Sequence, residues 1–180
     1  MKFSMENVMR LISILTLFIC STSWAGDFKI LDDDGTTVTV HYTGMVEPLD
    51  PFTLGAIIEV CVDRHIVIII DSGGGYAWAG VDLYWEAKKH DNLTLVAGSK
   101  LGAWSAAAIF WLADDEHLLM PDGIVGFHLA YCNSYNPPGC NTLEIDAAMQ
   151  EILEEGFGCK AADTLRDHLE WARGMFGVHG

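Results

Sequence analysis

Gly98-Ser-Lys-Leu-Gly-Ala-Trp-Ser-Ala-Ala-Ala-Ile-Phe-Trp-Leu-Ala113 is the stretch in which a strand, a turn and a helix meet. The strand-like run Leu93–Ala97 leads into the glycine-containing turn, and Ser105 opens the segment Ala106–Ala113, which is apolar on every side. A helix that is apolar all round has to be buried. Ser105 then lies at its first turn, where unpaired N–H groups and the helix dipole stabilise negative charge. The alternative is that Ser105 is only an N-cap.

The rest of the chain alternates strand-like and helix-like segments around this stretch. Strands are expected at Thr36–Tyr42 and His65–Ile70, and two further strands, Glu116–Met120 and Ile124–Ala130, form a hairpin arm around the turn Pro121–Gly123. Helices are expected at Phe52–Asp63, Ala77–His90, Leu143–Glu154 and Ala161–Phe176. Strand–helix alternation with short connections predicts a single α/β domain, residues 26–180, with a largely parallel sheet.

Composition limits the classes of partner. The chain has 180 residues, is 51% hydrophobic and carries a formal net charge of −15. Such an acidic chain has no basic surface to neutralise phosphates, so nucleic acid is not an expected partner. The same charge argues against adhesion to anionic lipid surfaces.

Residues 1–25 read as a signal peptide. Lys2 and Arg10 form a positive region, Leu11–Cys20 is a short apolar run, and Ser23-Trp-Ala25 offers a cleavage site. This pattern predicts a periplasmic or secreted protein cleaved after Ala25. An uncleaved membrane anchor through residues 11–20 is the alternative.

Four cysteines follow the leader. They are Cys61, Cys132, Cys140 and Cys159. An even number in an exported domain suggests disulfides. The turn-rich loop between Cys132 and Cys140 favours that pair, which leaves Cys61 with Cys159 by elimination; four buried free thiols are the alternative. The absence of a C-x-x-C pattern gives no support to a zinc ribbon or a thioredoxin-type site, and no metal or cofactor is expected.

A serine, a histidine and a glycine run form the candidate site. Ser105 is a poor nucleophile until a base such as His128 accepts its proton. Gly73-Gly-Gly75 and Ala106 can offer backbone N–H groups to an oxyanion. The plain alternatives are a core histidine and a flexible glycine turn.

The same residues carry a family resemblance. Ile70-Asp-Ser-Gly-Gly-Gly75, Gly102-Ala-Trp-Ser-Ala-Ala-Ala108 and Met120-Pro-Asp-Gly-Ile-Val-Gly-Phe-His128 resemble motifs of the Clp protease proteolytic subunit and the wider ClpP/crotonase-like superfamily. Gly44-Met-Val-Glu47 and Ala79-Gly80 fit the same pattern. Order and intervals match over about residues 36–130.

The resemblance implies a repeated β-β-α spiral and a serine peptidase. Ser105 would be the nucleophile and His128 the general base, with the N–H groups of Gly75 (or Gly74) and Ala106 forming the oxyanion hole. The family's Ser-Pro-Gly-Gly lacks its proline here, and its third catalytic residue has no matching motif. Asp163 and Asp167 are the nearest candidates for that acid, each with the alternative of being a solvated helix residue.

Export changes what the resemblance implies about partners. The Clp subunit is fed by a cytosolic ATP-driven unfoldase, so an exported relative would act without an ATPase on peptides or unfolded protein. A homo-oligomer is possible, although the loop Cys132–Cys140 falls where the family builds its oligomer-forming handle. Lys100 is too close in sequence to Ser105 to resemble the catalytic lysine of signal peptide peptidases, and Lys160 is only a remote candidate for it. Acyl-coenzyme A is not expected. The competing hypothesis is a catalytically degenerate, peptide-binding module.

Overall fold

The computed structural model describes residues 26–128, 130 and 142–157. Its main sheet has the strand order β1-β2-β3-β4-β6. These strands are β1 (Asp27–Asp33), β2 (Thr37–Thr43), β3 (His65–Asp71), β4 (Leu93–Ala97) and β6 (Leu118–Leu119). Strands β2, β3, β4 and β6 run parallel, and β1 joins the edge antiparallel to β2. The prediction of an α/β fold with a largely parallel sheet is confirmed.

A second, two-stranded sheet lies beside the first. It pairs β5 (Ala103–Trp104) with β7 (Val125–Gly126) in parallel. The expected hairpin arm around Pro121–Gly123 is therefore wrong: the turn leads from β6 in the main sheet to β7 in the small one, and both strands have two residues. The short apolar runs there gave no signal for the partner that each strand takes.

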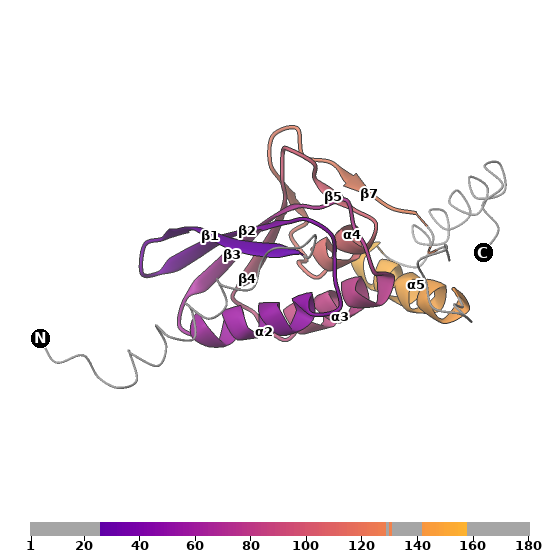
Figure 1. Ribbon diagram of the computed structural model, residues 1–180, viewed down its shortest axis with the longest axis horizontal. Helices are drawn as coiled ribbons and strands as arrows, with labels where there is room; N and C mark the ends of the chain where they lie inside the picture. The colour runs from indigo at the N-terminus through magenta and orange to yellow at the C-terminus, as the bar shows by residue number, and fades with distance from the viewer. Residues whose placement is uncertain (1–25, 129, 131–141, 158–180) are drawn as a thin grey trace, which may run out of the picture.

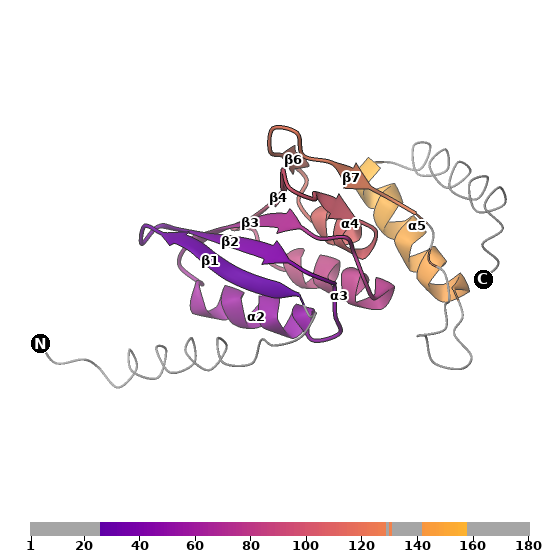
Figure 2. The ribbon, with the colours of Figure 1, turned by 45° about the horizontal axis from the view of Figure 1, so that its top comes forward.

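Helices cover one face of the main sheet. Figures 1 and 2 show α2 (Asp50–Val60) and α3 (Ala77–Ala87) lying along the same side of β2, β3 and β4. Alternate residues of the strands, such as Val40 and Ile68, point into this layer and are fully buried, whereas His41 and Ile69 on the opposite face are half-buried. The period-2 pattern of a sheet with one covered face explains this alternation.

The remaining helices extend the core beyond the sheet. Helix α4 (Ala106–Trp111) packs on α3 and is buried along its whole length, as its all-apolar sequence predicts. Helix α5 (Leu143–Phe157) lies outside α4 in Figure 2 and buries Ile145, Met149, Ile152 and Leu153. None of the helices in the described ranges is both long and apolar enough to cross a membrane.

The expected disulfide of Cys61 is wrong. Cys61 lies directly after α2 as a free thiol, 3% exposed, where the Arg64 guanidinium donates a hydrogen bond to Sγ at 3.2 Å. Burial raises the pKa of this thiol. The predicted pairing with Cys159 is therefore not found. Cys132, Cys140 and Cys159 lie outside the described residues, as do the leader and the expected helix Ala161–Phe176.

Candidate active site

Ser105 lies at a sharp turn between a strand and a helix. Strand β5 ends at Trp104 and α4 begins at Ala106, so Ser105 is the single residue between them. Its backbone has φ 56° and ψ −123°, a conformation that residues with a Cβ rarely adopt. Such strain costs of order 1–3 kcal/mol and persists only where the surroundings enforce it.

The surroundings hold this turn on both sides. The Ser105 N–H donates to the Gly126 carbonyl at 2.8 Å, and the Trp104 N–H donates to the Ser72 carbonyl at 3.0 Å. On the other side, the Ser105 carbonyl accepts the Ala108 N–H at 3.0 Å. The hydroxyl makes no capping hydrogen bond, so the alternative that Ser105 serves only as a side-chain N-cap is not supported.

Close helix packing also supports the turn. A Cβ added to Gly80 of α3 would lie 2.5 Å from the carbonyl oxygen of Ala106, so only glycine lets the two helices approach this closely. Ala106 itself is 2% exposed. The first turn of α4 is therefore held rigidly against α3, which is the physical reason that the strained backbone beside it survives.

The glycine turn comes directly against Ser105. Gly74 has φ +89°, and a Cβ placed on it would lie 2.5 Å from Ser105 Cβ and 3.1 Å from Ala106 N. The structure thus brings Gly74, Ser105 and the Ala106 N–H together, although about thirty residues of chain separate the two segments. Ala106 is the first residue of α4, so its N–H has no partner within the helix.

The backbone around Gly75 pairs with Val46 on one side, and the N–H and C=O of Gly75 itself point to the other side. Val46 donates its N–H to the Gly74 carbonyl at 3.0 Å and accepts the Tyr76 N–H at 2.9 Å, which forms a parallel bridge to Gly75. In a parallel bridge, the N–H and C=O of the central residue point away from the partner strand. The Gly75 N–H is thereby directed away from Val46.

His128 comes just after β7, the strand whose Gly126 carbonyl accepts the Ser105 N–H. Strand β7 runs beside β5 with Gly126 opposite Trp104, and His128 comes two residues after Gly126. The backbone therefore carries Ser105 and His128 past the same end of the small sheet. His128 is exposed, which rules out the alternative of a core histidine. Asp163 and Asp167, the candidate acids, lie outside the described residues.

Sequence reasoning missed a buried carboxylate beside the glycine turn. Asp71 ends β3 and is 7% exposed. Its Oδ1 accepts three backbone N–H groups, from Lys100 at 3.0 Å, Leu101 at 2.8 Å and Gly102 at 3.0 Å. Its Oδ2 is 2.8 Å from Nε2 of His41, in the second half of β2. Asp71 thus joins three elements: β2, β3 and the loop that leads to Ser105.

The electrostatics of Asp71 follow from these contacts. Burial by itself would raise the pKa of this carboxyl, but the three backbone N–H groups and the His41 ring together hold the pKa below its ordinary value. Asp71 is therefore an ionised carboxylate that anchors the loop. An aspartate placed between a buried strand and a glycine turn was the only sequence signal for it.

Ser72 fixes the glycine turn from inside. It is fully buried, its hydroxyl donates to the Gly44 carbonyl at 2.7 Å, and the same oxygen accepts the Gly74 N–H at 3.2 Å. The turn is consequently ordered by side-chain hydrogen bonds. This arrangement contradicts the alternative of a merely flexible glycine turn.

Within the described ranges, no cluster of three His, Cys, Asp or Glu residues could hold a metal ion.

Comparisons with known proteins bear on the fold. No protein-family model matches the chain, and no curated protein matches it in sequence. Among solved structures, an asparagine-to-aspartate mutant of ClpP1 from Listeria monocytogenes matches with a TM-score of 0.54 and 17% identity, over 70% of this chain and 77% of that one. At this identity the likeness concerns architecture alone. The chain therefore has a ClpP-like fold.

Proposed function

We propose that the protein is a serine peptidase that hydrolyses peptide bonds without ATP. One observation carries the proposal: Ser105 has a strained, left-handed backbone between a strand and a buried helix, with Gly74 against it. A strained strand-to-helix turn is the device by which hydrolases expose a serine hydroxyl beside backbone N–H groups. The ClpP-like fold supports a peptidase at the family level.

The chemistry would proceed by acyl transfer. His128 accepts the proton of the Ser105 hydroxyl while Oγ attacks the peptide carbonyl carbon. The N–H groups of Gly75 and Ala106 stabilise the oxyanion, whereas the alternative donor, the Gly74 N–H, already donates to the Ser72 hydroxyl oxygen. His128 then gives the proton to the leaving amine as the C–N bond breaks, and a water molecule hydrolyses the acyl-enzyme by the same steps. Asp163 or Asp167 would orient His128 as the third residue.

The setting of this activity is part of the proposal. Residues 1–25 would direct the chain to the periplasm or outside the cell, where no ATP-driven unfoldase would supply substrates. Peptides and unfolded proteins are the substrates that remain. ClpP homologues form oligomers, which fits a homo-oligomer here. The repeated β-β-α spiral is likewise a proposal beyond the observed largely parallel sheet.

A second candidate function is peptide binding without hydrolysis. The observation that favours it is the bridge between Val46 and Gly75, in which the backbone N–H and C=O of Gly75 point away from Val46. An extended peptide could add to this edge as a strand. Such a module would need the glycine turn but not the hydroxyl of Ser105.

A fluorophosphonate probe distinguishes the two functions, because it reacts covalently only with an activated serine. The peptidase predicts labelling of the wild type, loss of labelling in Ser105→Ala and unchanged labelling in Ser99→Ala. Ser99 is a matched control, because it is an exposed serine on the loop before β5. A folded wild-type protein that never labels would exclude the peptidase and favour the binding module.

A further inference from the structure

Most cations of the described chain are neutralised by carboxylates. Arg64 pairs with Asp33 at 2.6 Å, Lys88 with Asp115 at 2.7 Å, and Lys89 with Glu86 at 2.5 Å. Of the Lys and Arg residues in the described ranges, two make no ion pair: Lys29 and Lys100. Both are exposed.

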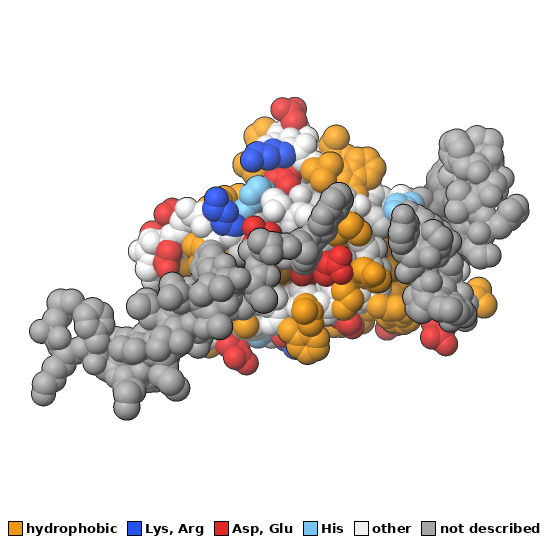
Figure 3. Space-filling view, in the orientation of Figure 1, with side chains coloured by type: hydrophobic (Ala, Val, Ile, Leu, Met, Phe, Trp, Pro, Cys, Tyr) orange, Lys and Arg blue, Asp and Glu red, His pale blue; other side chains and the backbone are white. Residues whose placement is uncertain are grey.

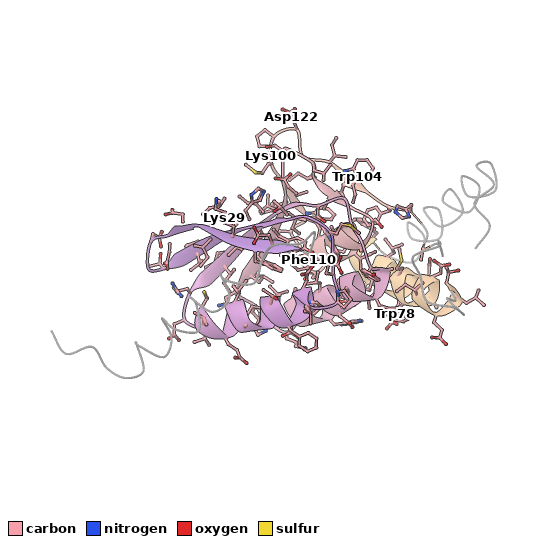
Figure 4. All side chains as sticks on the ribbon, in the orientation of Figure 1. Lys29, Trp78, Lys100, Trp104, Phe110 and Asp122 are labelled. Carbon is pink, nitrogen blue, oxygen red and sulfur yellow. The ribbon has the colours of Figure 1, made fainter. Side chains whose placement is uncertain are left out.

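These two lysines belong to the same part of the surface. Lys29 lies directly opposite His41 in the antiparallel pair of β1 and β2, so their side chains share one face of the sheet. The His41 ring contacts Asp71, and Asp71 accepts the backbone N–H of Lys100. Figure 4 labels both lysines, and Figure 3, in the same orientation, shows their blue side chains with pale blue histidine surface between them.

Asp71 does not neutralise these lysines. Its two oxygens are occupied by three backbone N–H groups and an imidazole, and none of its hydrogen bonds comes from an ammonium group. It is also 7% exposed, so it presents little negative surface. The ammonium groups of Lys29 and Lys100 are therefore open to an anion from outside.

The Asp71 carboxylate between the two lysines lies within the reach of a bound peptide from Ser105. Gly102 donates its N–H to the same Asp71 oxygen as Lys100, and Ser105 is three residues further along the chain. At about 3.3 Å per extended residue, this interval spans at most about 10 Å. An extended substrate covers that distance with about two to four residues.

We propose that Lys29 and Lys100 bind a carboxylate of the substrate, about two to four residues from the scissile bond; this rests on the peptidase site proposed above. The carboxylate is either the C-terminus of a short peptide or an acidic side chain. In a chain of net charge −15, the surface as a whole repels acidic peptides. Two unpaired cations beside the site make one local exception, which would set both the position and the direction of the bound peptide.

The test measures binding of fluorescent hexapeptides to the Ser105→Ala variant, which removes turnover. One peptide has a free C-terminal carboxylate, one is amidated, and one is amidated but carries an internal glutamate. The two anionic peptides should bind more tightly than the amidated one, by about three- to fivefold for each lysine engaged. The difference should shrink as salt is raised from 50 to about 500 mM.

Lysine variants show whether Lys29 and Lys100 cause the tighter binding of anionic peptides. Lys29→Gln and Lys100→Gln should each remove about three- to fivefold in affinity for the anionic peptides and none for the neutral one. Lys89→Gln is the matched control, because Lys89 is already paired with Glu86 on α3, and it should change neither. The free-carboxylate and internal-glutamate peptides show which source of charge the site prefers.

The outcomes separate this proposal from the peptidase itself. Equal binding of anionic and neutral peptides, or no binding of any anionic peptide up to about 1 mM, overturns the carboxylate site even if the probe labels Ser105. Charge-selective binding that both lysine variants abolish, in a protein that the probe never labels, keeps the carboxylate site and removes the hydrolase.

Discussion

Gly74 and Ser105 are in contact, and a Cβ on Gly74 would lie 2.5 Å from the Cβ of Ser105. The contact joins the turn after β3 to the turn before α4, and it exists because Gly74 has no side chain and a φ of +89°. The backbone nitrogen of Ala106 lies 3.1 Å from the position of that added Gly74 Cβ. The relative placement of hydroxyl and backbone donor therefore depends on one glycine.

Gly74→Ala should destabilise the fold and abolish probe labelling. The new methyl group meets Ser105 and the Trp104 carbonyl, and the backbone is left-handed, so we expect a loss of about 2–4 kcal/mol in the free energy of unfolding. Urea denaturation measures the loss. Gly73→Ala is the control, because its Cβ would meet nothing closer than Leu101 at 3.9 Å. Equal stability of the two variants would contradict the contact.

Two substitutions of Ser105 should differ in stability. Glycine adopts φ 56° without penalty, whereas alanine keeps the strain of the wild type. Ser105→Gly should therefore be more stable than Ser105→Ala by about 1 kcal/mol, and neither should be labelled by the probe. Thermal unfolding followed by circular dichroism gives the comparison. If Ser105→Ala is the more stable variant, the backbone at this position is not strained.

Asp71→Asn should destabilise the protein at neutral pH. The asparagine side chain carries no charge, and its NH₂ group cannot accept hydrogen bonds. Either the three backbone N–H groups of the loop or the His41 ring therefore loses its carboxylate partner, at a cost of about 2–4 kcal/mol. The folded-state pKa of Asp71 is below its ordinary value of 3.8, so its contribution is present above that value and is lost as pH falls through the folded pKa. The gap between wild type and variant should therefore narrow below about pH 4. A gap that is constant with pH would show that Asp71 acts through packing alone.

Asp50→Asn should behave in the opposite way. Burial raises the pKa of Asp50, and the hydrogen bonds from Tyr42 at 2.6 Å and from the Glu47 N–H at 2.8 Å offset only part of that effect. Both donors reach the same oxygen, Oδ2, which an asparagine carbonyl can replace. Because the folded pKa is raised, the contribution of Asp50 is present below its ordinary value of 3.8 and is lost as pH rises through the folded pKa.

The variant should consequently match or exceed the wild type in melting temperature at pH 8, with no advantage near pH 4. Asp50→Ala is the contrast, because it leaves the buried Tyr42 hydroxyl without its acceptor and should lose about 2 kcal/mol. Destabilisation of Asp50→Asn comparable with that of Asp50→Ala at pH 8 would show that the charge itself is needed.

Local pattern predicted the elements that depend on local forces. Strand β4 has the predicted bounds Leu93–Ala97, β3 follows the continuous apolar run from His65, and α4 is buried as its sequence requires. Strand β1 was missed because Asp27–Asp33 is mostly exposed and has no clear alternation. It forms by pairing along β2, which supplies backbone partners that the sequence of β1 does not indicate.

The same division holds at the candidate site. The chain by itself predicted Ser105, the glycines and a histidine as a set, since a serine opening a buried helix and a run of three glycines are visible in order. Only the tertiary structure decided that Asp71 takes His41 and the loop before β5 as partners, that β6 and β7 lie in different sheets, and that Ser105 is left-handed. Each of these depends on contacts between segments distant in sequence, and residue periodicity carries information on burial but not on which partner is chosen.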